Sequence, residues 1–284
     1  MSDMLEYRSG KTPSKNWATK RRQDAMGGRW KTVIPPMISV FVLLGVWYGF
    51  SARLKPSRQF LLPPPHSLFT KAFSNSRARG EIFSSLILTT ELALVGLLIA
   101  VFLGVSLGLL MYRFGWLERA SYPVLVALQA VPILAISPLM TVAFGYGFGS
   151  KCIVCVVISF FPIPTNLLLG LKSVEPSMHD LMTLHGAPWR TRIRKLALPN
   201  ALPYLFTAFR ISAGLSVIGA IVGEQFFQQG KPGLGQRLIQ YRVLLEYERL
   251  YATLLVSSLL GISVYLFFTV LGKRLTYKWH ASAS

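Results

Sequence analysis

The sequence predicts an all-α integral membrane protein with about six transmembrane helices. Of its 284 residues, 52% are hydrophobic and only 14% are charged, whereas about a quarter of the residues in a soluble domain are charged. Several apolar stretches reach the roughly 20 residues that a helix needs to cross a bilayer core about 30 Å thick. Composition and stretch length therefore both indicate that lipid surrounds much of this chain.

Six apolar stretches are long enough to be membrane spans. In chain order they cover 33–50, 84–112, 122–144, 153–171, 203–226 and 251–271. The first opens with Pro35 and Pro36, which are tolerated in a first helical turn. The third carries Pro132 and Pro138, which predict a kinked or interrupted helix. Residues 1–32 are polar and basic and are expected to form a cytoplasmic tail, so the transmembrane domain is expected to cover 33–280.

The charge is strongly positive, with 30 Lys and Arg against 11 Asp and Glu, for a net charge of +19. Such an excess is typical of nucleic-acid binding, of contact with anionic lipid, or of the Lys and Arg bias in membrane-protein loops. The apolar stretches favour the third interpretation, so the bilayer is an expected partner and nucleic acid is not. With the N-terminus inside, the inner segments hold 18 Lys and Arg and the outer loops hold 11. This bias predicts that both termini are cytoplasmic.

The sequence lacks the motifs of several other functions. Cys152 and Cys155 have the spacing of half a metal site, but there is no second pair, so no metal or redox role is expected. There is no phosphate-binding loop of the GxxxxGK[ST] type and no HExxH or GxSxG motif. We therefore expect that the chain is not an enzyme and does not itself hydrolyse ATP.

The segment 173–199, between the fourth and fifth spans, has a pattern of its own. Glu175 and Pro176 are typical of a first helical turn, because the helix dipole favours an acid there and proline lacks only an unused N–H. Gly186 is placed to end that helix in a left-handed conformation. Apolar residues and a histidine recur on one face at helical spacing: Met178, Leu181, Met182 and His185. The sequence thus predicts a short amphipathic helix, a tight turn and a second short helix. The apolar face predicts docking, either on the membrane surface or in a groove of another protein.

This segment resembles the EAA loop of binding-protein-dependent ABC importers, whose pattern is E-A-A, three residues, G, nine residues and I-x-L-P. Asp180, Leu181 and Met182 stand at the E-A-A positions, and Gly186 follows after three residues. Nine further residues lead to LALP at 196–199. The spacing matches in full, while Asp replaces Glu, Leu and Met replace the alanines, and Leu replaces Ile. We call residues 173–199 the EAA-type loop.

Other motifs resemble the branch of these permeases that carries sulfonates or taurine, nitrate, and thiamine-precursor pyrimidines or riboflavin. Near Ile136 this chain lacks the tryptophan that the branch usually has. The matching segments are FLLPPP at 60–65, VPILAISPL at 131–139, FGYGFGSK at 144–151, PNALP at 199–203, GLG at 233–235, KRL at 273–275 and Trp279 with His280. The resemblance covers about 33–280.

The resemblance implies a type I ABC importer permease fold in the plasma (inner) membrane, with the EAA-type loop carrying a cytoplasmic coupling helix. Its implied partners are ABC ATPase subunits, an extracytoplasmic solute-binding protein and a second permease subunit, giving a homodimer. ATP and Mg would be bound by the ATPase, and this chain would hold no cofactor. The residues expected to contact the ATPase are Met178, Asp180, Leu181, Met182, His185, Gly186 and Arg190.

Polar residues within the spans are candidates to line the solute pathway, because a central charge in a bilayer costs about 2.5–3.5 kcal/mol on insertion scales. These candidates are Glu91, Gln129, Ser137, Thr141 and Glu224. Two glycine pairs, Gly104 with Gly108 and Gly219 with Gly223, predict close helix packing. A secondary transporter driven by an ion gradient is the main alternative function, although Glu91 alone gives it little support and no inverted repeat is apparent.

Overall fold

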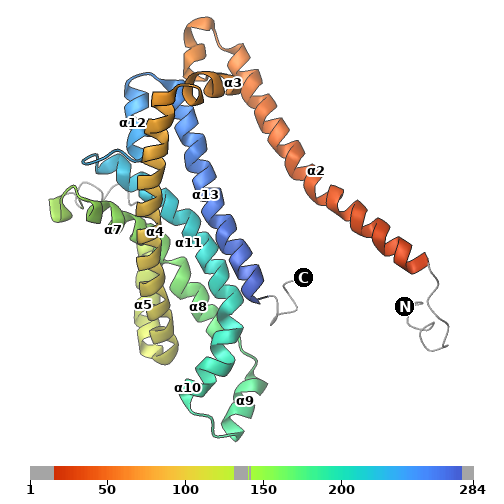
Figure 1. The fold of residues 1–284 in the computed structure, drawn as a ribbon. Helices are drawn as coiled ribbons and strands as arrows, with labels where there is room; N and C mark the ends of the chain where they lie inside the picture. Colours follow the sequence, from red (N-terminus) through yellow and green to blue (C-terminus); the bar gives the residue numbers. More distant parts are fainter. Residues whose placement is uncertain (1–15, 131–139, 141, 277–284) are drawn as a thin grey trace. The chain divides into compact units, whose positions relative to one another are not determined.

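The computed structural model describes residues 16–130, 140 and 142–276, and the chain forms two compact units, 1–66 and 67–284. Within the described residues the regular structure is helical, which confirms the predicted all-α class (Figure 1). The first unit contains helix α2 (Asn16–Arg53) and a 3₁₀ helix (Pro56–Leu61). The short helix α3 (Pro65–Ser67) follows at the boundary between the two units.

Helix α2 differs from the predicted first span at its start. The sequence suggested a start near Val33 with the two prolines in the first turn, but α2 begins at Asn16 and holds Pro35 and Pro36 in its interior. Polar residues before the span continue the helix, so half of the expected tail is helical. After α2 the FLLPPP segment folds back on it, because Trp47 Nε1 and Ser51 Oγ donate to the carbonyls of Pro63 and Leu62 at 3.1 and 2.9 Å.

The second unit is a bundle of long helices joined by short ones. A π-helical segment (Leu68–Phe73) leads to α4 (Ser76–Arg113), whose first N–H groups are capped by the Asn75 side chain. The remaining helices are α5 (Gly115–Ala130), α7 (Phe148–Phe160), α8 (Pro162–Lys172), α9 (Pro176–Leu184), α10 (Trp189–Arg192), a π-helical segment (Ile193–Ala197), α11 (Leu198–Phe226), α12 (Leu234–Val243) and α13 (Tyr247–Thr276).

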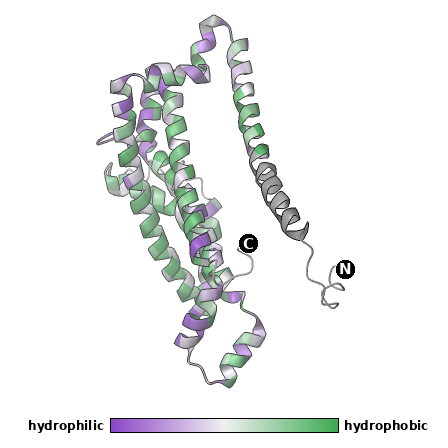
Figure 2. Ribbon diagram, turned by 45° about the vertical axis from the view of Figure 1, so that its right-hand side comes forward, coloured by the Kyte–Doolittle hydropathy of each residue, from purple (hydrophilic) through white to green (hydrophobic). Residues whose placement is uncertain are grey.

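Five helical segments in the described part of the chain are long and apolar enough to cross a membrane. They are Ile34–Arg53, Ser76–Arg113, Phe148–Lys172, Trp189–Phe226 and Tyr247–Leu275. These correspond to five of the six predicted spans. The other predicted span, 122–144, overlaps the end of α5, but residues 131–139 and 141, with Pro132 and Pro138, lie outside the described residues. Figure 2 shows that the long helices of the bundle are mainly hydrophobic and that hydrophilic residues gather toward their ends.

Small residues let the long helices pack closely, as the glycine pairs predicted. A Cβ atom at Gly104 or Gly108 would lie 2.8 Å from Ile163 or 2.9 Å from Leu167 of α8. A Cβ at Gly219 would lie 2.7 Å from the Cα of Cys155, and one at Gly223 would lie 3.0 Å from the carbonyl oxygen of Lys151. The packing role of both glycine pairs is therefore confirmed.

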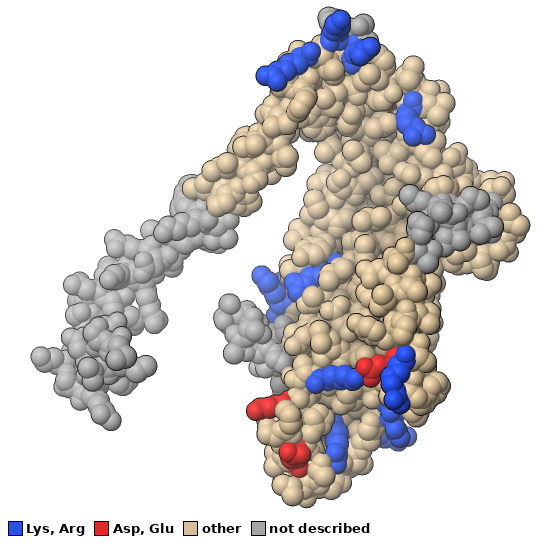
Figure 3. All heavy atoms as spheres, turned by 180° about the vertical axis from the view of Figure 1, so that it is seen from behind, with Lys and Arg blue, Asp and Glu red and all other residues tan. Residues whose placement is uncertain are grey.

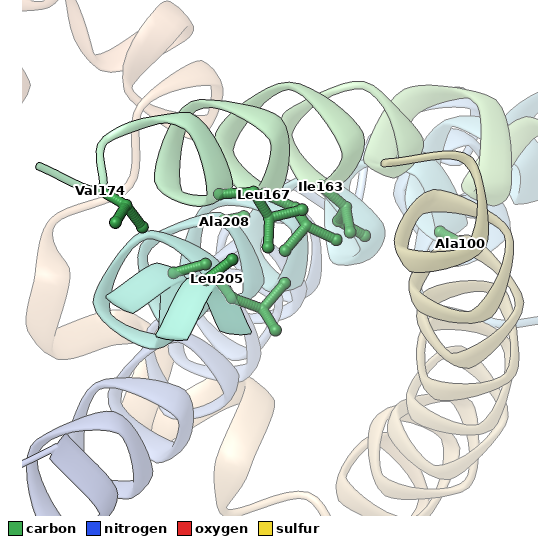
Figure 4. Packing of buried hydrophobic residues seen from close by; sticks show 9 residues of the cluster. Ala100, Ile163, Leu167, Val174, Leu205 and Ala208 are labelled. Carbon is green, nitrogen blue, oxygen red and sulfur yellow. The ribbon is translucent and has the colours of Figure 1, made fainter. Parts of the chain in front are cut away.

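The main core cluster joins α4, α8 and α11 and extends to the flanks of the EAA-type loop. Figure 4 shows Ile163 and Leu167 beside Leu205 and Ala208, with Ala100 on the neighbouring α4. Val174 and Ala197, from the two flanks of the EAA-type loop, belong to the same buried cluster. Both ends of the EAA-type loop are therefore anchored in the core of the bundle.

Candidate functional site

The first helix of the EAA-type loop forms where its local signals place it. Glu175 has an extended backbone conformation (φ −63°, ψ 134°) and precedes α9, and Pro176 occupies the first helical turn. Proline suits this position because the first N–H groups of a helix have no partner within the helix. At the other end, His185 donates its backbone N–H to the Leu181 carbonyl at 3.1 Å.

Gly186 ends α9 with a left-handed residue, as predicted. Its φ is +62°, a value that side chains with a Cβ disfavour. Its N–H donates to the Thr183 carbonyl, and the Ala187 N–H donates to the Met182 carbonyl, both at 3.0 Å. This pair of bonds is the Schellman motif, which satisfies carbonyls that the helix end leaves open. The turn between α9 and α10 therefore has one defined geometry.

An arginine that the sequence analysis did not select holds this turn from the second helix. Arg192 donates from Nε to the Ala187 carbonyl at 2.9 Å and from an Nη atom to the Thr183 hydroxyl at 3.1 Å. Arg192 thus links α10 to the last turn of α9. Arg190, which was selected, is exposed instead. No spacing rule distinguishes the two, since only the folded turn brings Arg192 to its acceptors.

The apolar face of α9 is largely uncovered. Met178 and Leu181 are 48% and 49% exposed, and Leu184, which the sequence analysis did not select, is 84% exposed. Asp180 and His185 are also exposed, while Met182 is half-buried. In Figure 1, α9 and α10 lie together at one end of the bundle, and α12 lies at the other end. Exposing several large apolar side chains on so short a helix is costly in water, which favours a partner surface.

The EAA-type loop is also fastened to the bundle by polar and aromatic contacts. The Asn200 amide donates to the Gly170 carbonyl at 3.2 Å and to the Ser173 hydroxyl at 2.9 Å, tying α11 to the end of α8. The Arg113 guanidinium, at the end of α4, lies 5.1 Å from the ring centre of Trp189 in α10. Figure 3 shows Lys, Arg, Asp and Glu side chains gathered at the end of the bundle that carries the EAA-type loop, at the bottom of the view.

A second group of predicted residues lies near the opposite end, and its two acids have different surroundings. Glu224 is only 2% exposed, whereas Glu91 is exposed. Both border the same small cavity, of about 170 Å³. Gln129 borders another cavity, of about 390 Å³, formed otherwise by apolar residues of α4, α5, α7, α8 and α11. Ser137 and Thr141 lie outside the described residues.

The Glu224 carboxylate is held by two other helices. The Thr89 hydroxyl of α4 lies 2.8 and 3.0 Å from its two oxygens, and the Gly235 N–H of α12 donates to it at 2.8 Å. Thr89 in turn accepts the Leu234 N–H at 2.8 Å. Glu224 and Thr89 together therefore cap the N-terminus of α12. Thr89 was not selected from the sequence, because its partners are more than a hundred residues away.

The far end of α12 is anchored through Tyr241, which is buried. Its hydroxyl donates to the Glu81 carboxylate at 3.1 Å, and Arg237 lies 3.5 Å from the same carboxylate. Burial, together with this hydrogen bond, raises the pKa of Tyr241 to about 12. The phenol therefore remains a hydrogen-bond donor across the physiological pH range.

The family of the chain follows from a match over most of its bundle. The family model described as "Binding-protein-dependent transport system inner membrane component" matches residues 96–277, which include the EAA-type loop. The chain belongs to this family. It is an ABC importer permease, and its helices make it a multi-pass membrane protein.

Named permeases are similar over most of the chain. The formylaminopyrimidine transport permease protein ThiX of Halalkalibacterium halodurans is 35% identical over 78% of this chain and 87% of its own length. The riboflavin transport system permease protein RibX of Chloroflexus aurantiacus is 31% identical over 86% and 90%. The putative aliphatic sulfonates transport permease protein SsuC of Bacillus subtilis is 27% identical over 85% and 86%.

The fold of the permease is also that of a solved transporter chain. A chain of the MetNI methionine ABC transporter, in inward-facing conformations, matches with a TM-score of 0.59 and 22% sequence identity. The match covers 72% of this chain and 98% of that one. The predicted permease fold is therefore confirmed.

Proposed function

We propose that this permease forms the solute pathway of an ATP-driven importer and that the EAA-type loop couples the pathway to a separate ATPase. The observation that carries this proposal is the uncovered apolar face of α9, held on a turn that Gly186 and Arg192 fix. A helix that docks its apolar residues in a groove of a partner needs such a face. A rigid turn would then pass the partner's movement to α8 and α11 without dissipating it.

The remaining parts of the importer would be separate chains. An extracytoplasmic binding protein would deliver the solute, two ATPase subunits would bind ATP and Mg, and a second copy of this permease would complete the pathway. The EAA-type loop and both termini would then face the cytoplasm, as the Lys and Arg bias predicts. The family description supports the binding protein, since it names transport that depends on one.

The substrate would be a small solute of the kinds that the relatives carry. The relatives at 35% and 31% identity are named for a formylaminopyrimidine and for riboflavin, both nitrogen heterocycles, and the relative at 27% is named for aliphatic sulfonates. A nitrate import permease is 26% identical over 71% of this chain. We favour a heterocycle over a sulfonate or nitrate.

Co-purification and uptake test this function together. We expect an ABC ATPase to co-purify with the tagged permease, and uptake into vesicles that contain the complex and its binding protein to stop when ATP hydrolysis is blocked. Uptake that continues without ATP hydrolysis and follows an ion gradient would instead support a secondary transporter. Absence of any ATPase from the purified complex would also contradict the importer.

Arg192→Ala should weaken coupling without preventing assembly. The substitution removes two hydrogen bonds from a charged donor, each of which contributes about 1.5–3 kcal/mol. Since 1.4 kcal/mol is a factor of ten, we expect the solute transported per ATP hydrolysed to fall about tenfold or more. Arg194→Ala is the matched control, because Arg194 is an exposed arginine two residues further along the chain. If both variants transport equally less solute per ATP, coupling depends on the positive charge of this segment and not on the hydrogen bonds that fix the turn.

A further inference from the structure

The cavity of about 170 Å³ near the α12 end of the bundle carries charges of both signs. It is bordered by Glu91 of α4, Lys151 of α7, Glu224 of α11 and Lys231 of the turn that follows α11. Two acids and two lysines line the cavity, so the formal charge of the lining is balanced. The pair Glu224 and Lys151 makes hydrogen bonds within the protein, whereas the pair Glu91 and Lys231 does not among the described residues.

Glu224 and Lys151 belong to the framework of the cavity. The Glu224 carboxylate is held by Thr89 and Gly235. Lys151 is 7% exposed, and its ammonium donates to the Gln229 carbonyl at 3.0 Å. That bond holds the turn in which Lys231 lies. Both side chains are therefore committed to bonds that shape the cavity wall.

Glu91 and Lys231 differ from this pair, because their charged groups are available to a ligand. Both are exposed, and among the described residues neither side chain has a hydrogen-bond or ion-pair partner. Glu91 lies within the long apolar helix α4, where an ionised side chain is costly unless it meets a partner, water or a ligand. A carboxylate and an ammonium that border one cavity offer an acceptor and a donor to a molecule placed between them.

We propose that this cavity is a subsite for a small solute without net charge that carries hydrogen-bond donors on one side and acceptors on the other. The donors would face Glu91 and the acceptors would face Lys231. A bare anion would gain from the lysines but would be repelled by the acids, so the balanced lining disfavours it. Amino-substituted single-ring heterocycles have this chemistry.

The volume of the cavity limits the size of the solute. Pockets that enclose drug-sized ligands measure roughly 300–1,000 Å³, and this one measures about 170 Å³. The wall also offers apolar surface from Leu88, Leu92 and Phe148. A flat ring with polar substituents at its edge matches both features. This proposal rests on the proposed importer function and narrows its substrate class.

Direct binding to the permease tests the subsite. The permease–ATPase complex is placed in lipid nanodiscs without its binding protein, so that the binding protein's own selectivity does not intervene. Labelled aminopyrimidine and labelled methanesulfonate are the two probes.

We expect the natural chain to bind aminopyrimidine more tightly than methanesulfonate. Glu91→Gln should weaken aminopyrimidine binding about tenfold, equivalent to about 1.4 kcal/mol, and should strengthen methanesulfonate binding. Lys231→Met should weaken aminopyrimidine binding and weaken methanesulfonate binding further.

Arg79→Met is the control. Arg79 is an exposed cation near the N-terminal end of α4, and it does not border the cavity. It should bind both probes like the natural chain. Glu91 and Lys231 are exposed, so their variants should elute like the natural complex. The subsite is overturned if Glu91→Gln and Lys231→Met bind both probes unchanged, if the natural chain binds neither probe, or if it prefers methanesulfonate. ATP-driven uptake is measured separately, in vesicles that contain the natural complex and its binding protein, and absence of that uptake contradicts the importer itself.

Discussion

Gly186→Pro is expected to abolish ATP-driven uptake while the protein still inserts into the membrane. Proline holds φ near −65°, whereas Gly186 has a φ of +62°. Proline also lacks the N–H that Gly186 donates to the Thr183 carbonyl. The helix end would unwind, and α9 would lose its fixed orientation relative to α10. The measurements are uptake into vesicles, the amount of permease in the membrane fraction and the amount of co-purified ATPase.

Gly186→Asn is the matched control for this variant. Asparagine adopts the left-handed conformation more readily than other residues with a side chain, and it keeps the N–H. No neighbouring atom lies within 4 Å of a Cβ at this position, so the added side chain has room. We expect Gly186→Asn to retain most of the uptake. Normal uptake by Gly186→Pro would contradict the role of the EAA-type loop in coupling.

Glu224→Ala is expected to destabilise the bundle strongly. The substitution leaves the Thr89 hydroxyl and the Gly235 N–H without their acceptor in a buried place. A buried hydrogen-bond donor that loses its acceptor costs about 1–3 kcal/mol, and here two donors lose the same acceptor. The N-terminal cap of α12 would weaken, and this end of α12 would pack less tightly on α4 and α11. Thermal unfolding in detergent, followed by the fraction of protein that remains monodisperse, measures this change.

Glu246→Ala provides the comparison, because Glu246 makes a partly exposed ion pair with Arg249 at 2.9 Å. Such pairs contribute about 0–1 kcal/mol, so this variant should unfold close to the natural chain. Gly233→Ala should behave like Glu224→Ala, since a Cβ at Gly233 would overlap the Glu224 carboxylate. If Glu224→Ala unfolds at the same temperature as Glu246→Ala, the buried carboxylate does not hold α12.

Local signals in the sequence predicted the EAA-type loop well. Helix start, amphipathic face and left-handed end all depend on neighbouring residues, and α9 begins at Pro176 and is closed by Gly186 as expected. The Arg192 hydrogen bonds were not predicted, because they depend on the geometry of the folded turn. The Thr89 cap was not predicted, because its partners lie 135 and 145 residues away in the sequence. These contacts have no periodic pattern.

The surroundings of Glu91 and Glu224 also could not be predicted from the sequence. Glu91 and Glu224 both lie in apolar stretches and appear equivalent in the sequence, so both were selected as pathway candidates. In the structure Glu224 is buried and hydrogen-bonded, while Glu91 is exposed. Burial depends on which helices pack together, and hydropathy alone does not determine that. Whether either acid meets the solute stays a prediction.

The packing of Cys155 has a practical consequence for labelling studies. Its side chain is fully buried between α4 and α11, next to Gly96 and Gly219, and its thiol donates to the Ser216 carbonyl at 3.1 Å. Cys152, the other cysteine of the sequence, is 7% exposed. Both thiols are shielded from reagents in solution. A cysteine introduced at an exposed position such as Met178 would then be the main target of a thiol-reactive probe, without prior removal of the native cysteines.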